Sequence, residues 1–135
     1  MNTLVKSSFF TLAVITSNIS VANNISTDFI NNEVKITHNE YLHGSPEVAI
    51  YAMESLVRLL QTVQSNGLLL KINHSSLSLS YIRLGFLYEK SGLKQKADIA
   101  FSKAVASYKS SDNKSENISL KDLKSFVRYL DVRIS

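Results

Sequence analysis

The histidines are the residues whose type and spacing come nearest to a recognisable chemical motif. His38 and His43 flank Glu40 in the segment HNEYLH. A zinc-protease helix carries two histidines four residues apart on one face, with a glutamate directly after the first. Here the histidines are five residues apart and the glutamate follows the first by two. They do not share one helix face, and we expect no bound metal.

The other groups that enzymes use are present without a catalytic arrangement. The sequence has no cysteine, which excludes disulfides, thiolate metal sites and a cysteine nucleophile. Glu47 and Glu54 lie seven residues apart in a region expected to be helical, and no carboxylate pair is marked out for acid–base work. There is no G-x-S-x-G turn, no glycine-rich phosphate loop and no dinucleotide fingerprint. We therefore expect a non-enzymatic protein without a cofactor.

The composition indicates one helical domain. The chain has 135 residues, of which 44% are hydrophobic and 19% charged, and this is enough apolar material for a single core. One proline and four glycines argue against a sandwich or barrel, which needs many tight turns. The formal net charge of +4 is mild. We interpret the lysine-rich helix faces as ordinary solvated surface and expect no nucleic-acid partner.

The first 22 residues are typical of a secretory signal peptide. Lys6 precedes an uncharged run that is most apolar between Phe9 and Ile15 and ends in Ser20-Val21-Ala22, with small residues at the cleavage positions. The apolar part is far shorter than the ~20 residues that span a bilayer. We expect cleavage after Ala22 and an exported chain, periplasmic or secreted, with no membrane span afterwards. The lack of cysteines favours a bacterial periplasm.

Downstream of residue 22, capping residues and apolar spacing predict four helices. Residues 23–44 are polar and asparagine-rich without a sustained apolar period, and we expect a flexible lead there. Ser45 and Pro46 suit the start of the first helix, which ends before Gly67. Ser119 and Asp122 resemble a capping box at the start of the last helix. The predicted helices cover residues 45–66, a stretch capped by Ser75 or Ser76 and running to about 90, about 94–109, and 119–134, within a domain of residues 45–135.

The second and third predicted helices contain a recognisable set of residues between Ser76 and Lys109. Small residues stand where two antiparallel helices would approach closely, and large ones fill the spaces between. These residues are Tyr81, Leu84, Gly85, Tyr88, Gly92, Ala97, Phe101 and Ala104. In their spacing the segment resembles a tetratricopeptide repeat. The resemblance covers about a quarter of the chain, and no second copy follows at the family's spacing of about 34 residues.

The resemblance implies an all-α fold of helical hairpins stacked as in an α-solenoid, with about four helices after the cleaved leader. It also implies a groove lined by the first helix of the repeat, in which a protein or peptide segment binds. One side of that helix is apolar, so either the chain's own first predicted helix covers it or a partner does. The candidate binding residues are Leu79, Ile82 and Phe86, with Arg83, Glu89 and Lys90 as a polar rim.

These observations lead us to expect an exported, tetratricopeptide-repeat-like module for protein–protein interaction, which could also self-associate. An alternative is a stabilising or accessory subunit of a cell-envelope complex. A further alternative is a small exported enzyme or ligand carrier, which would need a cluster of polar side chains inside the helical bundle. The identity of a co-purifying protein would separate the first two hypotheses from the third.

Overall fold

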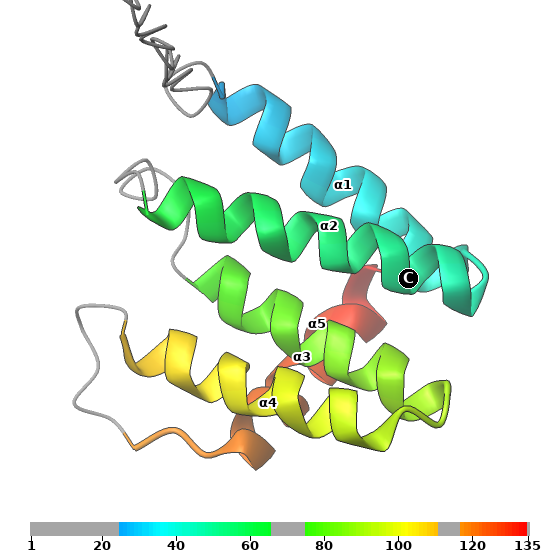
Figure 1. The fold of residues 1–135 in the computed structure, drawn as a ribbon, viewed down its shortest axis with the longest axis vertical. Helices are drawn as coiled ribbons and strands as arrows, with labels where there is room; N and C mark the ends of the chain where they lie inside the picture. The colour runs from blue at the N-terminus through cyan, green and yellow to red at the C-terminus, as the bar shows by residue number, and fades with distance from the viewer. Residues whose placement is uncertain (1–24, 66–74, 111–116, 135) are drawn as a thin grey trace, which may run out of the picture.

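The computed structural model describes residues 25–65, 75–110 and 117–134, and within these ranges every regular element is a helix. The predicted all-α class is confirmed, and none of the described helices is long and apolar enough to cross a bilayer. The predicted signal peptide and its cleavage site lie outside the described residues. The five helices, shown in Figure 1, are α1 (Thr27–His43), α2 (Pro46–Ser65), α3 (Ser75–Lys90), α4 (Lys94–Lys109) and α5 (Leu120–Ile134).

Two helical hairpins and one final helix make up the fold. The α1–α2 hairpin turns at Gly44-Ser45, and the α3–α4 hairpin turns around Gly92. The α2 and α3 helices pack side by side and join the two hairpins into one stack, while α5 lies behind α3 and α4 in the view of Figure 1. The most extensive helix–helix contact is the one between α3 and α4.

Local capping chemistry sets the ends of the predicted helices. The Ser45 hydroxyl accepts a hydrogen bond from Val48 N at 3.4 Å at the start of α2. At the start of α5, Ser119 Oγ accepts from Asp122 N at 3.2 Å and Asp122 Oδ2 accepts from Ser119 N at 3.1 Å, so the predicted capping box is present. Gly92 adopts a φ of +74° in the α3–α4 turn, a conformation that favours glycine.

Helix α1 corrects the expectation of a flexible lead over residues 23–44. The Ser26 hydroxyl accepts from Phe29 N at 3.1 Å and caps a helix of 17 residues. Its inward side carries Ile30, Val34, Thr37 and Tyr41, which recur at helical spacings of four, three and four. The expectation failed because two of these four positions are polar, which hides the apolar period. Thr37 is nevertheless only 4% exposed.

The α3–α4 hairpin is packed as closely as its small residues predict. A Cβ atom added at Gly85 would lie 2.2 Å from Phe101 Cε1, so only glycine leaves room for this ring. Ala97 and Ala104 on α4 are fully buried. The Ser78 hydroxyl donates to the Ala104 carbonyl at 2.8 Å across the contact. These contacts confirm the predicted close approach of the two helices.

Helix α5 is only partly embedded. Leu123 and Val127 are fully buried, but the apolar side chains of Phe126 and Ile134 are exposed. The packing of α5 against α3 and α4 is much less extensive than the packing of these two helices against each other. Its attachment therefore depends strongly on the polar and cationic side chains described below.

Candidate functional site

The predicted apolar binding side of α3 is filled from within the chain. Ile82 has 0% exposure and belongs to the core. Phe86 packs edge-on against Phe101, with ring centroids 5.9 Å apart, and the guanidinium of Arg128 on α5 lies 4.9 Å from its ring centroid. Because Ile82 is buried in the core and Phe86 lies between Phe101 and Arg128 of α5, these two residues do not form the open groove expected from the sequence.

The predicted polar rim is divided between two places. Glu89 pairs with Lys124 of α5 at 3.1 Å, and the same lysine ammonium lies 3.6 Å from the ring centroid of Phe101. Lys90 is exposed at the end of α3. Leu79 and Arg83 instead lie on the side of α3 that looks toward α1, where they line a pocket. The six predicted binding residues therefore do not form one site, because Phe86 and Glu89 lie beside Lys124 whereas Leu79 and Arg83 line the pocket.

A single carboxylate joins three helices at this second place. Asp131 Oδ1 on α5 accepts hydrogen bonds from Arg83 Nη2 at 2.8 Å and Nε at 3.0 Å. Its other oxygen, Oδ2, accepts from the Tyr41 hydroxyl of α1 at 2.9 Å. The Arg83 guanidinium also lies 5.9 Å from the Tyr41 ring centroid. We call these three residues, together with neighbouring His38, the α1–α3–α5 junction.

The electrostatics of the junction keep the tyrosine and the histidine uncharged at neutral pH. Burial, followed by the charge of Asp131 and the hydrogen bond to it, raises the pKa of Tyr41 far above 10.0. Burial and then the positive charge of Arg83 lower the pKa of His38 below 6.5, although Asp131 opposes this effect. Within the described part of the chain, His38 Nε2 is buried and has no hydrogen-bond partner.

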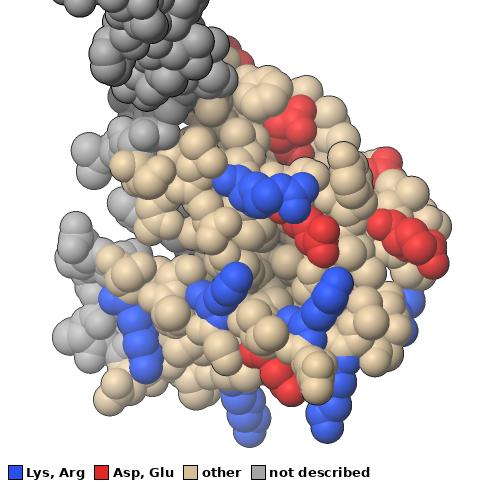
Figure 2. All heavy atoms as spheres, viewed as in Figure 1, with Lys and Arg blue, Asp and Glu red and all other residues tan. Residues whose placement is uncertain are grey.

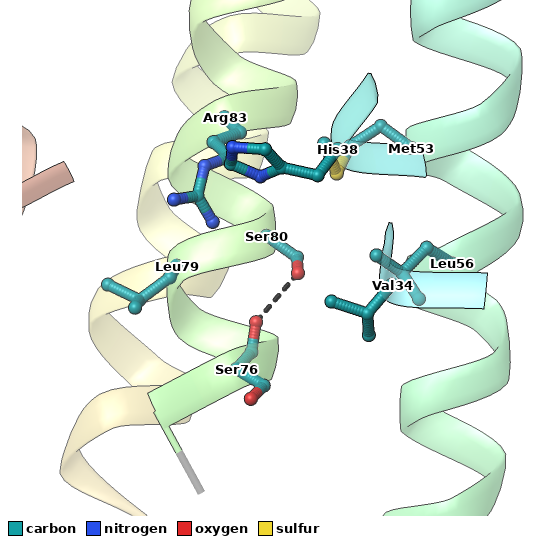
Figure 3. Close-up of a pocket in the computed structure, with 8 residues that line it drawn as sticks. All are labelled: Val34, His38, Met53, Leu56, Ser76, Leu79, Ser80 and Arg83. Carbon is teal, nitrogen blue, oxygen red and sulfur yellow. Dashed lines mark hydrogen bonds between the residues drawn. The ribbon is translucent and has the colours of Figure 1, made fainter. Parts of the chain in front are cut away.

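Two adjoining pockets open beside the junction, and His38, Arg83 and Val34 line both. Figure 3 shows the inner pocket, where the His38 side chain extends from α1 toward Arg83 on α3. This pocket is small, about 80 Å³. The outer pocket is wider, about 480 Å³, and open to solvent. The remaining residues of the outer pocket are Lys35, Asn39, Leu42 and His43 of α1 and Ile134 of α5.

The chemistry of the outer pocket suits binding. Its walls combine aliphatic side chains with two imidazoles, an amide and two cationic groups, and its lining includes no carboxylate and no hydroxyl nucleophile. Arg83 is already neutralised by Asp131, whereas His38 offers a buried nitrogen without a partner. No cluster of three or more metal-binding side chains occurs among residues 25–65, 75–110 and 117–134. Such a pocket holds a partly apolar group and fixes its orientation by hydrogen bonding.

Sequence reasoning missed most of this site. His38 was considered only as a metal ligand, and neither Tyr41 nor Asp131 belongs to any local motif. Tyr41 and Asp131 are 90 residues apart in the sequence, and only the fold brings them together. Arg83 was identified as part of the rim of a groove on α3, but its partner on α5 was not.

Comparisons with protein-family models, with curated proteins and with solved structures find no match to this chain.

Proposed function

We propose that this chain is an exported, non-enzymatic interaction module that resembles a tetratricopeptide repeat and binds a segment of another protein. The binding site is the outer pocket beside the α1–α3–α5 junction. The observation that carries the proposal is the unpartnered, buried Nε2 of His38 at the wall of an open pocket of about 480 Å³. A buried polar group without a partner costs free energy, and a turn of the His38 ring that brings this nitrogen to a hydrogen-bonding group of a ligand in the pocket would remove that cost.

The lining indicates the kind of segment that fits. Val34, Leu42 and Ile134 provide an apolar surface for one side chain of the partner. His38 and Asn39 provide hydrogen bonds that set the direction of the bound segment. The fixed junction behind them favours binding because the walls are already ordered before the partner arrives.

The architecture supports an interaction module in two further ways. The α3–α4 hairpin has the close helix contacts at Gly85 and Ala104 that the repeat resemblance implies. Asp131 holds α1, α3 and α5 together at one site, so side chains from three helices can contact one partner. Export follows from the leader-like residues 1–22 alone and remains part of the proposal.

Quantitative capture of partners from the native cell envelope tests the proposal. Asn39 is exposed and lines the outer pocket, so the variant Asn39→Trp would obstruct the pocket without entering the core. Asn31→Trp is the matched control, because Asn31 is exposed on the same helix and does not line the pocket. We expect the first variant to lose a protein that the parent and the control both retain. Equal capture by both variants would exclude this pocket as the binding site.

A further inference from the structure

A third pocket lies away from the junction, in the surface of the α3–α4 hairpin. Its volume is about 180 Å³. An apolar cavity of about 150 Å³ can hold a benzene ring, so this pocket has room for one aromatic or large aliphatic side chain. We call it the α3–α4 slot. It is lined by Tyr81, Leu84 and Tyr88 of α3 and by Lys96, Ile99, Ala100 and Lys103 of α4.

The slot has a fixed floor and a basic rim. The Tyr81 hydroxyl accepts a hydrogen bond from Gln61 of α2 at 2.7 Å, and the Tyr88 hydroxyl donates to Glu54 of α2, so α2 holds both rings in place. The ammonium of Lys96 lies 5.5 Å from the Tyr88 ring centroid, and that of Lys103 lies 5.9 Å from the Tyr81 ring centroid.

The two lysines are seven residues apart, about 10 Å along α4 at the rise of a helix. Between them Ile99 is 57% exposed, which is unusual for so large an apolar side chain in the middle of a helix. An aromatic group with a negative charge about one helical turn away from it would complement this rim.

Helix α2 of the same chain carries such a group. Tyr51 is 71% exposed and has Glu47 one turn before it and Glu54 one turn after it. Side chains at these spacings share a helix face. Glu54 on that face accepts a hydrogen bond from Tyr88 of the slot, so the Tyr51 face and the slot adjoin each other on the surface of the protein. In Figure 2 most of the visible acidic side chains lie in the upper and right-hand part of this face, and most of the basic ones lie in the lower part, with one group of the opposite sign in each part.

We propose that this face binds the same face of a second copy of the chain. The Tyr51 ring of each copy enters the α3–α4 slot of the other, and Glu47 pairs with the lysine rim. A two-fold interface requires one surface to carry both halves of each contact. Here a projecting ring with acidic neighbours and a ring-sized slot with basic neighbours occur on one surface. Two copies can therefore form the ring-in-slot contact twice, once in each direction.

Sedimentation velocity tests this pairing. It is measured over a range of protein concentrations on the form of the chain that is isolated from its host. We expect reversible dimers, and Tyr51→Ala should weaken association at least about tenfold because an aromatic anchor is lost. Tyr129→Ala is the matched control, because Tyr129 is also an exposed aromatic residue but lies on α5. Circular dichroism should show unchanged melting for both variants. A chain that stays monomeric, or a dimer that Tyr51→Ala leaves unchanged, would overturn the proposal.

A charge exchange tests the orientation of the two copies. Replacing Lys96 and Lys103 by glutamate should weaken the dimer, and adding Glu47→Lys to that variant should restore it. Failure of the third substitution to restore association would contradict the pairing. Asn39→Trp, which obstructs the junction pocket, should leave the dimer intact, so this proposal and the proposed function can fail independently. Binding of an added acidic helical peptide to the slot of a monomeric chain would assign the slot to another occupant and refute the pairing.

Discussion

Asp131 on α5 binds Arg83 on α3 with one carboxylate oxygen, at 2.8 and 3.0 Å, and keeps its second oxygen for the Tyr41 hydroxyl of α1. The two ionic side chains are only 12% and 14% exposed. Helix α5 buries few apolar residues, so this carboxylate fixes a helix that hydrophobic contact holds only in part. The junction therefore determines both the position of α5 and the shape of the pocket beside it.

Replacing Asp131 by alanine should destabilise the protein. The substitution leaves the Arg83 guanidinium and the Tyr41 hydroxyl partly buried without their acceptor, and we expect a loss of ~1–3 kcal/mol in the free energy of unfolding. Asp98→Ala is the control, because Asp98 is an exposed carboxylate on α4, and it should change stability by less than ~0.5 kcal/mol. Urea unfolding of the three proteins measures the difference. Equal stabilities would mean that the junction does not hold α5.

The stability of the protein should depend on the protonation of His38. Its pKa in the folded state lies below 6.5, mainly because of burial, so the unfolded chain takes up this proton first as the pH falls. The free energy of unfolding should therefore decline as the pH drops through about 6.5. His38→Gln should reduce this slope, whereas His43→Gln, at an exposed position on the same helix, should retain it. Unfolding curves between about pH 8 and 5.5 measure both slopes. If the His38→Gln variant keeps the wild-type slope, His38 is not the group that causes this pH dependence.

Gly85→Ala should destabilise the α3–α4 hairpin although alanine favours helices. The new methyl group would lie 2.2 Å from Cε1 of the buried Phe101 ring, and overpacking of this kind costs ~1–3 kcal/mol. The gain in helix propensity, up to ~1 kcal/mol, offsets only part of that cost. Combining Gly85→Ala with Phe101→Leu removes the ring and should make the glycine substitution much less harmful. Thermal melts of the four proteins form a double-mutant cycle, and additive effects would contradict the close contact.

Ile82 should behave as a core residue. Ile82→Ala removes apolar atoms from a fully buried site and should cost ~2–5 kcal/mol. Ile36→Ala is the matched control, because Ile36 is half exposed on α1, and its effect should be small. If Ile82→Ala melts like the parent but fails to capture a partner, the original interpretation of Ile82 as a binding residue is correct and the core assignment is wrong.

Most of the fold could be predicted from the sequence because its signals are local. Ser119 with Asp122, Ser45 with Pro46 and the glycine at position 92 mark helix ends through capping and turn chemistry that acts within a few residues. The apolar spacing of α2 is an equally clear local signal, and the residues that recur at intervals of three and four are all buried: Ala49, Met53, Leu56, Leu60 and Val63. The polar inward positions of α1 gave no such signal, because the burial of Thr37 and the partial burial of Tyr41 come from contacts that only the folded protein provides.

The candidate site was harder to predict because its contacts join residues that are far apart in the sequence. Arg83 and Asp131 are 48 residues apart, and nothing in the local sequence of either indicates the other. The apolar side of α3 was recognised, but the choice between internal cover and a partner depended on where α5 lies. Sequence spacing defines the faces of a helix, whereas the neighbour of each face is decided by tertiary packing.

The leader-like start makes a separate prediction. If residues 1–22 act as a signal peptide, the mature chain should begin at Asn23 and should be released from the envelope fraction without detergent. Intact-mass analysis of that fraction measures the start of the chain directly. Recovery of an uncleaved chain that remains with membranes after a salt wash would contradict export by cleavage.

The most direct test of the interaction site is site-specific photocrosslinking in the cells that produce the protein. A photoreactive residue at position 39 lies on the wall of the outer pocket, and one at position 31 lies on the same helix outside it. Our account predicts that position 39 forms a covalent adduct with one defined protein, which mass spectrometry identifies, and that position 31 does not. No adduct from position 39, or the same adducts from both positions, would contradict the proposal that the junction pocket binds a partner.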